Sequence, residues 1–178
     1  MHGESGALVV FSLGANIGPR EENVLEAYRL LGGIGGVHSL KLSSLYETEP
    51  QGEGYSGPFV NAVALAETVC VPLPLLEACM RIERALGRGQ DGGVGDRTID
   101  IDIILYGDRV IDVPNLRIPH PRFRERPFVL EPLLEVAPEL TAPPDGRRIH
   151  QIREELSSNL WVRKISTRSV VDGLLNLC

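Results

Sequence analysis

Cysteine is scarce in this chain of 178 residues, which carries three, none of them in a CxxC pair. An odd number without close pairing argues against a disulfide framework and a zinc site, so we expect buried thiols. No apolar run approaches the roughly 18 residues that a membrane-spanning helix requires. The N-terminal segment lacks the basic start and small-residue cleavage site of a signal peptide. We therefore expect a cytoplasmic protein without a membrane partner.

Positive charge is also in deficit, with 18 Lys and Arg against 24 Asp and Glu and a net charge of -6. This balance opposes general affinity for nucleic acid. The arginines nevertheless gather in two segments, residues 81–97 and, around His120, residues 117–126. Such clusters are typical of proteins that bind a small, highly charged anion, although exposed loops rich in arginine would look the same.

The common nucleotide-binding and hydrolase motifs are absent as well. The sequence has no Walker loop, no GxGxxG turn and no Ser-His-Asp ordering. Any site for a charged small molecule must therefore be of another kind.

An unusual strand pattern, GDRTIDIDIILYG, occupies residues 95–107. Successive side chains of a strand point to opposite faces, so Asp100 and Asp102 share one face, about 7 Å apart. The other face is apolar and is formed by Ile99, Ile101, Ile103 and Leu105. Two carboxylates without a neighbouring His or Cys favour a hard cation such as Mg²⁺, with substrate phosphates completing its shell. An ordinary solvated strand face is the alternative.

The order of predicted elements indicates the fold. We expect strands and helices alternating as β-α-β-β-α-β, over residues 7–13, 19–31, 37–48, 59–68, 72–87 and 97–106. This is an α+β, ferredoxin-like core, an antiparallel sheet with helices on one face and the other face free. Short helices are expected over 129–136 and after Gly146. Residues 1–178 then form one domain, with a C-terminal extension, 153–178, of unassigned role.

Six collinear motifs resemble those of the 6-hydroxymethyl-7,8-dihydropterin pyrophosphokinase family, over about residues 7–152. They are SLGANIG, LYETEP, FVNAVALAET, RIERALGR, RTIDIDIILYG and IPHPRFRERPFVLEPLLEVAPEL. The resemblance implies transfer of pyrophosphate from the co-substrate ATP to the pterin hydroxymethyl group, with AMP released, two Mg²⁺ ions, small-molecule partners and a monomer.

The resemblance also implies roles for individual residues. Asp100 and Asp102 match the magnesium ligands, and together with Arg88 and Arg97 they form the implied catalytic set. The implied pterin contacts are Thr48, Glu49, Gln51, Phe59, Asn61 and Phe128, with the two Phe rings stacking on the pterin. The implied ATP contacts are Glu83, Arg88, Arg97, Ile103, Arg117, His120 and Arg126.

The chain departs from the family pattern just before the acidic strand. The usual GPR is GDR here, which places Asp96 beside Arg97, and the loop from Arg88 to Arg97 is short and lacks the aromatic and extra basic residues of some members. Its four glycines within residues 89–96 predict a loop that is mobile without ligand and closes as a lid over ATP and Mg²⁺.

Two other functions fit the same fold. A magnesium-dependent nucleotidyl transferase or cyclase also carries a carboxylate pair on such a sheet, and a ligand-binding module would leave the pair merely solvated. Release of AMP, rather than ADP, on mixing ATP with the pterin would distinguish the pyrophosphokinase from both these and from an ordinary kinase.

Overall fold

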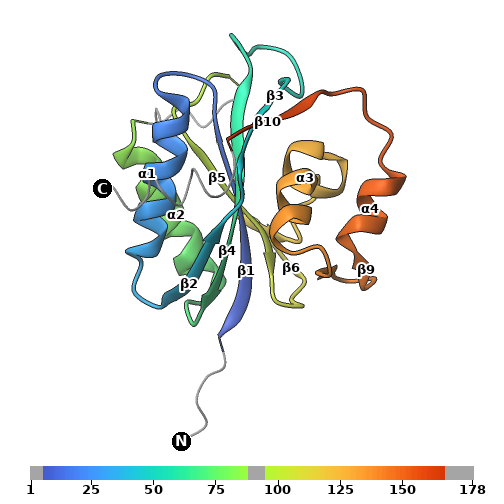
Figure 1. Cartoon of the computed structure of the whole chain (residues 1–178). Coiled ribbons are helices and arrows are strands. Elements are labelled where there is room, and N and C mark those ends of the chain that lie inside the picture. The colour runs from blue at the N-terminus through green and yellow to red at the C-terminus, as the bar shows by residue number, and fades with distance from the viewer. Residues whose placement is uncertain (1–5, 88–94, 167–178) are drawn as a thin grey trace, which may run out of the picture.

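The computed structural model describes residues 6–87 and 95–166 (Figure 1). Its elements are β1 (Ala7–Ala15), α1 (Arg20–Gly32), β2 (Val37–Leu42), β3 (Leu45–Thr48), β4 (Phe59–Thr68), α2 (Pro72–Ala85), β5 (Asp100–Tyr106), β6 (Ile111–Val113), β7 (Leu116–Ile118), the 3-10 helix η1 (Phe123–Glu125), α3 (Pro127–Val136), β8 (Thr141–Ala142), β9 (Arg147–Arg148), α4 (Ile149–Glu155) and β10 (Val162–Ser166). Arg88, most of the predicted lid and Cys178 lie outside these ranges. None of the described helices is long and apolar enough to cross a membrane.

The central sheet has six antiparallel strands in the order β10-β3-β4-β1-β5, with β2 also paired to β4. Helices α1 and α2 cover one face (Figure 1), as the βαββαβ pattern predicts. The larger apolar core fills the space between them and the sheet. The predicted α+β fold class is confirmed.

The opposite face of the sheet is not free, and that expectation was wrong. Helix α3 packs on it, with α4 beside α3 (Figure 1). A second apolar cluster joins Val129, Leu130 and Leu133 of α3 to Val63 and Ile104 of the sheet. The pocket described below lies on this face, beside the start of α3.

The predicted single strand over residues 37–48 is interrupted at Ser43 and Ser44. The Ser43 hydroxyl accepts a hydrogen bond from Val63 N–H at 3.0 Å and donates one to the Ser44 carbonyl at 2.7 Å. Such short side-chain bonds compete with the regular ladder and allow the chain to turn between two strands. Both β2 and β3 still pair with β4, so the two halves of the predicted strand occupy the same edge of β4.

A bulge interrupts β5. Val10 pairs with Leu105 and Phe11 with Ile103, so Ile104 is an extra residue opposite β1. The bulge reverses the alternation beyond it, because two residues of one strand face one of the other. Leu105 therefore packs in the cluster with α3 instead of sharing the face of Ile101 and Ile103, which corrects that expectation.

The C-terminal segment contributes the outermost strand on the β3 side. Strand β10 pairs with β3, and the Trp161 carbonyl just before it accepts a hydrogen bond from Glu49 N–H at 3.2 Å. Arg163 also forms an ion pair with Glu47 at 2.5 Å. Residues 161–166 thus brace the end of β3, where Thr48 and Glu49 lie.

Candidate active site

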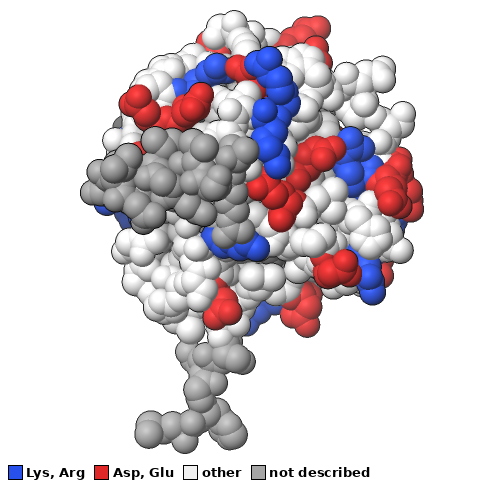
Figure 2. Space-filling model, viewed as in Figure 1, with Lys and Arg blue, Asp and Glu red and all other residues white. Residues whose placement is uncertain are grey.

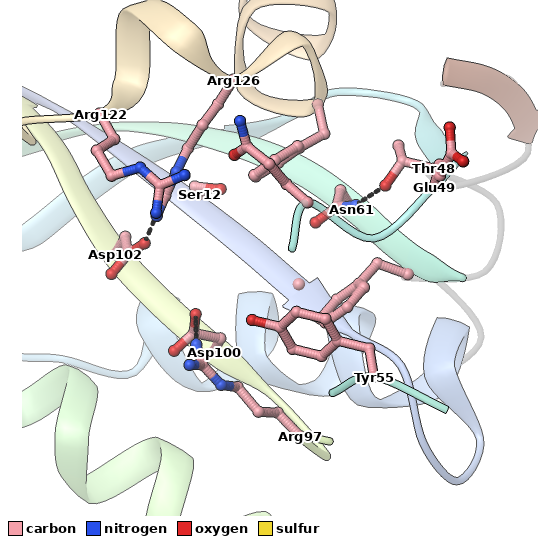
Figure 3. A pocket seen from close by; sticks show the side chains of 14 residues that line it. Ser12, Thr48, Glu49, Tyr55, Asn61, Arg97, Asp100, Asp102, Arg122 and Arg126 are labelled. Carbon is pink, nitrogen blue, oxygen red and sulfur yellow. Dashed lines mark hydrogen bonds and ion pairs between the residues drawn. The ribbon is translucent and has the colours of Figure 1, made fainter. Parts of the chain in front are cut away.

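A pocket opens where β1, β3, β4 and β5 face the start of α3 (Figure 3). Its lining combines acidic, basic, amide and aromatic side chains: Ser12, Gly14, Thr48, Glu49, Gln51, Tyr55, Phe59, Asn61, Arg97, Asp100, Asp102, Arg122, Arg126 and Phe128. Six charged side chains thus lie beside three aromatic rings. The mixture suits a flat heteroaromatic molecule joined to, or next to, an anionic group.

Asp100 and Asp102 lie on the pocket face of β5, as the alternation predicts (Figure 3). Each carboxylate meets a different arginine: Arg97 forms an ion pair with Asp100, and Arg126 Nη1 lies 3.0 Å from Asp102 Oδ2. The side chains of Asp100 and Asp102 are 22% and 31% exposed. Both carboxylates and both guanidinium groups therefore remain within reach of a bound molecule.

A second hollow adjoins the first, and Asp102 lines both. The second hollow is also lined by Leu76, Ile103, Pro114, Asn115, Leu116, Arg117, His120 and Pro121. It offers apolar surface next to the side chains of Arg117 and His120, which can carry positive charge. The carboxylate of Asp102 thus lies at the junction of an aromatic pocket and a hollow suited to an anion with an apolar part.

His120 is held tightly at this junction. Its backbone N–H donates to the Ile104 carbonyl at 2.9 Å, and its ring Nδ1 accepts from Arg122 N–H at 3.2 Å. The proton of the neutral ring therefore lies on Nε2, 3.7 Å from Asp102 Oδ2. Burial lowers the pKa of His120, and the nearby Asp102 opposes that shift. The neutral form is the main one near pH 7.

Asn61 and Thr48 form the buried wall of the pocket. Asn61 Nδ2 donates to Thr48 Oγ1 at 2.7 Å, which fixes the amide in one orientation. Gly14 lies directly opposite Asn61 on the neighbouring strand. A Cβ at Gly14 would lie 2.7 Å from Asn61 Oδ1, so the glycine provides the space that this orientation needs.

Comparison with known proteins identifies the family. The sequence model for 7,8-dihydro-6-hydroxymethylpterin-pyrophosphokinase (HPPK) matches residues 10–138, well over half of the chain. The chain belongs to this pyrophosphokinase family. Curated relatives include the 2-amino-4-hydroxy-6-hydroxymethyldihydropteridine pyrophosphokinases of Pseudomonas aeruginosa, 37% identical over 81% of this chain and 88% of the relative, and of Bacillus subtilis, 39% identical over 75% and 80%.

A fungal relative of the pyrophosphokinase is much longer. The folic acid synthesis protein fol1 of Schizosaccharomyces pombe is 36% identical over 96% of this chain, which spans only 24% of that protein. Among solved structures, a Plasmodium falciparum HPPK-DHPS crystal structure with pteroate has a TM-score of 0.67 at 16% identity, over 87% of this chain and 43% of the other. At this identity the likeness supports the pyrophosphokinase fold alone.

The structure gathers most of the pyrophosphokinase residues implied by the sequence. All six implied pterin contacts line the aromatic pocket, together with Arg97, Arg126 and the Asp pair, whereas Ile103, Arg117 and His120 line the second hollow. Arg88 lies outside the described residues. Their individual roles stay predictions.

Glu83 lines neither of these two pockets. It is buried on α2, and its Oε1 accepts a hydrogen bond from Ile101 N–H at 2.8 Å. Since β5 ends the sheet path, this N–H faces the outer edge of the sheet, and the carboxylate supplies its partner. The observed contact is therefore structural, and the implied contact with ATP stays a prediction.

Four pocket residues were not among the implied site residues, namely Ser12, Gly14, Tyr55 and Arg122, although Arg122 belongs to the arginine cluster of residues 117–126. Ser12 and Gly14 belong to the quoted SLGANIG motif, and their placement opposite Asp102 and Asp100 follows from the register of β1 and β5. The SLGANIG motif and the pairing of β1 with β5 are therefore the signal that could have identified Ser12 and Gly14. Tyr55 lies in the loop between β3 and β4 and has no periodic pattern around it, so only the three-dimensional contacts of that loop place it in the pocket.

Proposed function

We propose that this protein transfers pyrophosphate from ATP to 6-hydroxymethyl-7,8-dihydropterin in folate biosynthesis. The hydroxymethyl oxygen forms a bond to the β-phosphorus of ATP and loses its proton. The bond from that phosphorus to the oxygen bridging the α and β positions breaks, and AMP leaves with that oxygen. The observation that carries the proposal is the meeting of an aromatic pocket and an anion-suited hollow at Asp102.

The aromatic pocket fits the pterin. Asn61 and Thr48 present fixed polar groups at its buried wall, and Phe59 and Phe128 are half-buried, leaving ring surface for a flat partner. Glu49 and Gln51 form its rim, and Gln51 Nε2 is held by the Glu125 carbonyl at 3.2 Å. Stacking would exclude water from the pterin while leaving its hydroxymethyl group directed at the charged residues.

The second hollow fits the nucleotide. Leu76, Ile103 and Leu116 provide apolar surface for the adenine, while Arg117 and His120 lie where phosphate oxygens would need donors. Arg126 joins the two hollows because it contacts Asp102 and its guanidinium lies 5.6 Å from the Phe128 ring centre. Its buried Nε has no hydrogen-bond partner among the described residues, which leaves a donor for a bound phosphate.

The acidic pair fits two magnesium ions, which we propose as cofactors held by Asp100 and Asp102. The two carboxylates share one strand face and are partly exposed. Hard cations with few protein ligands take the rest from water and substrate phosphates. Bound ions would neutralise phosphate charge, while Arg97 and Arg126 would then turn from the carboxylates toward phosphate oxygens.

The proposal includes a single domain over residues 1–178 that acts as a cytoplasmic monomer on small molecules. Neither nucleic acid nor a membrane is a proposed partner. The net charge of -6 supports this, and on the face shown in Figure 2 the acidic and basic side chains of the described residues are interspersed without a broad basic area.

Product analysis tests the proposed reaction directly. Mixing the protein with ATP, Mg²⁺ and 6-hydroxymethyl-7,8-dihydropterin should yield AMP and the pterin diphosphate in equal amounts. Formation of ADP would instead indicate an ordinary kinase, and release of inorganic pyrophosphate a nucleotidyl transferase. Binding without any product would favour the ligand-binding module.

The proposed stacking pair gives a second test. Phe59→Ala and Phe128→Ala should each weaken pterin binding by about 0.5–1.5 kcal/mol beyond the loss of buried area, because an aromatic contact is removed. Affinity for a non-hydrolysable ATP analogue should stay nearly unchanged. Calorimetric titration with each ligand measures both effects. Equal losses for both ligands would mean that these rings serve only the structural core.

Gly14→Ala should damage the same pocket by crowding. The added Cβ would lie 2.7 Å from Asn61 Oδ1, and the buried Asn61 cannot yield without losing its bond to Thr48. We expect unfolding free energy to fall by about 1–3 kcal/mol and pterin affinity to fall with it. Chemical denaturation and pterin titration measure the two changes. Gly35→Ala is the matched control, since its Cβ would meet nothing within 4 Å; unchanged pterin affinity in Gly14→Ala would contradict the prediction.

A further inference from the structure

The loop between β3 and β4, residues 49–58, is tied to the rest of the protein at several points. Gln51 near its start bonds to the Glu125 carbonyl. The Pro58 carbonyl at its end accepts from Arg20 Nη1 at 2.7 Å, and Arg20 Nη2 lies 2.9 Å from Glu47 Oε1. These contacts restrain both ends of the loop against three different elements.

The second half of the loop is held by Asp96. Asp96 Oδ1 accepts hydrogen bonds from Ser56 N–H at 2.8 Å and from Asn16 Nδ2 at 2.6 Å. Asn16 is buried, and its Oδ1 accepts a hydrogen bond from Arg97 N–H at 2.6 Å. Asp96 is therefore held in place by a side chain that is itself fixed. Hydrogen bonds from Ser56 and Asn16 lower the pKa of Asp96, which therefore stays ionised near neutral pH.

The anchored residue Ser56 adjoins Tyr55, which lines the pocket. The Tyr55 ring is half-buried and meets the Phe59 ring edge-on, with their centres 5.1 Å apart. In Figure 3 the Tyr55 side chain points into the pocket, on the side where Asp100 lies. A fixed main chain at Ser56 limits the directions in which this ring can turn.

We propose that Tyr55 forms part of the binding wall for the heteroaromatic substrate and that Asp96 is a positioning residue that holds Tyr55 there. The inference rests on the proposed function and extends it to two residues that the implied site does not include. Tyr55 presents aromatic surface adjoining Phe59, and Asp96 acts only through the loop, 40 positions away in sequence from Ser56.

A double-mutant cycle tests this coupling. The probe is 6-hydroxymethylpterin, titrated in the presence of a non-hydrolysable ATP analogue and Mg²⁺. Loss of one aromatic contact predicts that Tyr55→Ala raises the Kd about 2- to 12-fold, while Tyr55→Phe retains the ring and stays near wild type. Asp96→Ala should raise the Kd by no more than Tyr55→Ala does. The double variant should match Tyr55→Ala alone if Asp96 acts on the pterin entirely through Tyr55.

Matched variants separate the anchor from simpler effects. Asp96→Asn keeps an acceptor oxygen for Ser56 N–H and should restore most of the affinity, even if Asp96→Ala folds poorly. Asp108→Ala removes the same charge at the far end of β5 and should leave the Kd unchanged. Affinity for the ATP analogue should stay constant throughout, whereas a role through Arg97 would change nucleotide binding or turnover and leave the pterin Kd intact.

Three outcomes would overturn the inference: an unchanged pterin Kd in Tyr55→Ala, additive effects of the two substitutions, or a change confined to nucleotide binding or turnover. If the unaltered protein bound no pterin and released no AMP, the proposed function itself would fail. The two failures are therefore distinguishable, because the inference is overturned only by variants of a protein that is active and binds pterin.

Discussion

Asp100→Asn and Asp102→Asn should each reduce pyrophosphoryl transfer by about 10³-fold or more. Asparagine keeps the size of the side chain and one oxygen, but it removes the charge that a hard cation requires. Loss of a single group that stabilises transition-state charge already costs roughly 10²- to 10³-fold. AMP release at millimolar Mg²⁺ measures the effect.

The fold should survive both substitutions. Each carboxylate is compensated by its own arginine, Asp100 by Arg97 and Asp102 by Arg126, and partly exposed ion pairs contribute only about 0–1 kcal/mol. Thermal unfolding should therefore shift by a few degrees at most. Asp108→Asn, at the other end of β5, is the charge-matched control and should retain full activity. Near-normal turnover in either site variant would remove the argument for a metal platform.

Arg97→Ala should slow the transfer step by about 10²- to 10³-fold while weakening nucleotide binding much less. In the structure the guanidinium is engaged by Asp100, and its backbone N–H is fixed by Asn16. If a cation occupies that carboxylate, as proposed, the guanidinium gains most from charge that develops during transfer. Single-turnover rates and titration with an ATP analogue separate the two quantities.

Arg97→Lys is the informative partner of this variant. A lysine keeps the positive charge but cannot offer a planar pair of donors, so we expect partial recovery of the rate. Equal losses of rate and nucleotide affinity in Arg97→Ala would show that Arg97 binds the ground state as strongly as the transition state. The prediction that residues 89–96 close as a lid concerns mostly undescribed residues, and hydrogen exchange with and without ligand remains its test.

The strict alternation of acidic and apolar side chains made the orientation of Asp100 and Asp102 on β5 predictable from the sequence. Asp100 and Asp102 reach the pocket because nothing between them disturbs the two-residue period, and the motif resemblance then placed Asn61, Thr48 and Phe59 beside them. These residues lie on regular strands whose register follows from their apolar neighbours.

Other parts depended on contacts that no local pattern reveals. Glu83 was implied as an ATP contact by the family resemblance alone, and no local pattern reveals that its carboxylate accepts a hydrogen bond from the Ile101 N–H of β5. Ser56, the neighbour of Tyr55, donates its backbone N–H to Asp96, which lies 40 positions away in sequence. The position of α3 was hidden because its apolar residues fit either face of a sheet, and only the completed βαββαβ layer leaves it one face to cover.

The bulge at Ile104 also has a mechanical consequence for the distant carboxylates. A smooth antiparallel strand at the edge of a sheet can slide along its neighbour by two residues and keep the same faces. Strand β5 resists this, because sliding would carry the extra residue away from the one position on β1 that accommodates it. The bulge therefore fixes the register of β5 against β1, so that Asp102 remains opposite Ser12 and Asp100 opposite Gly14.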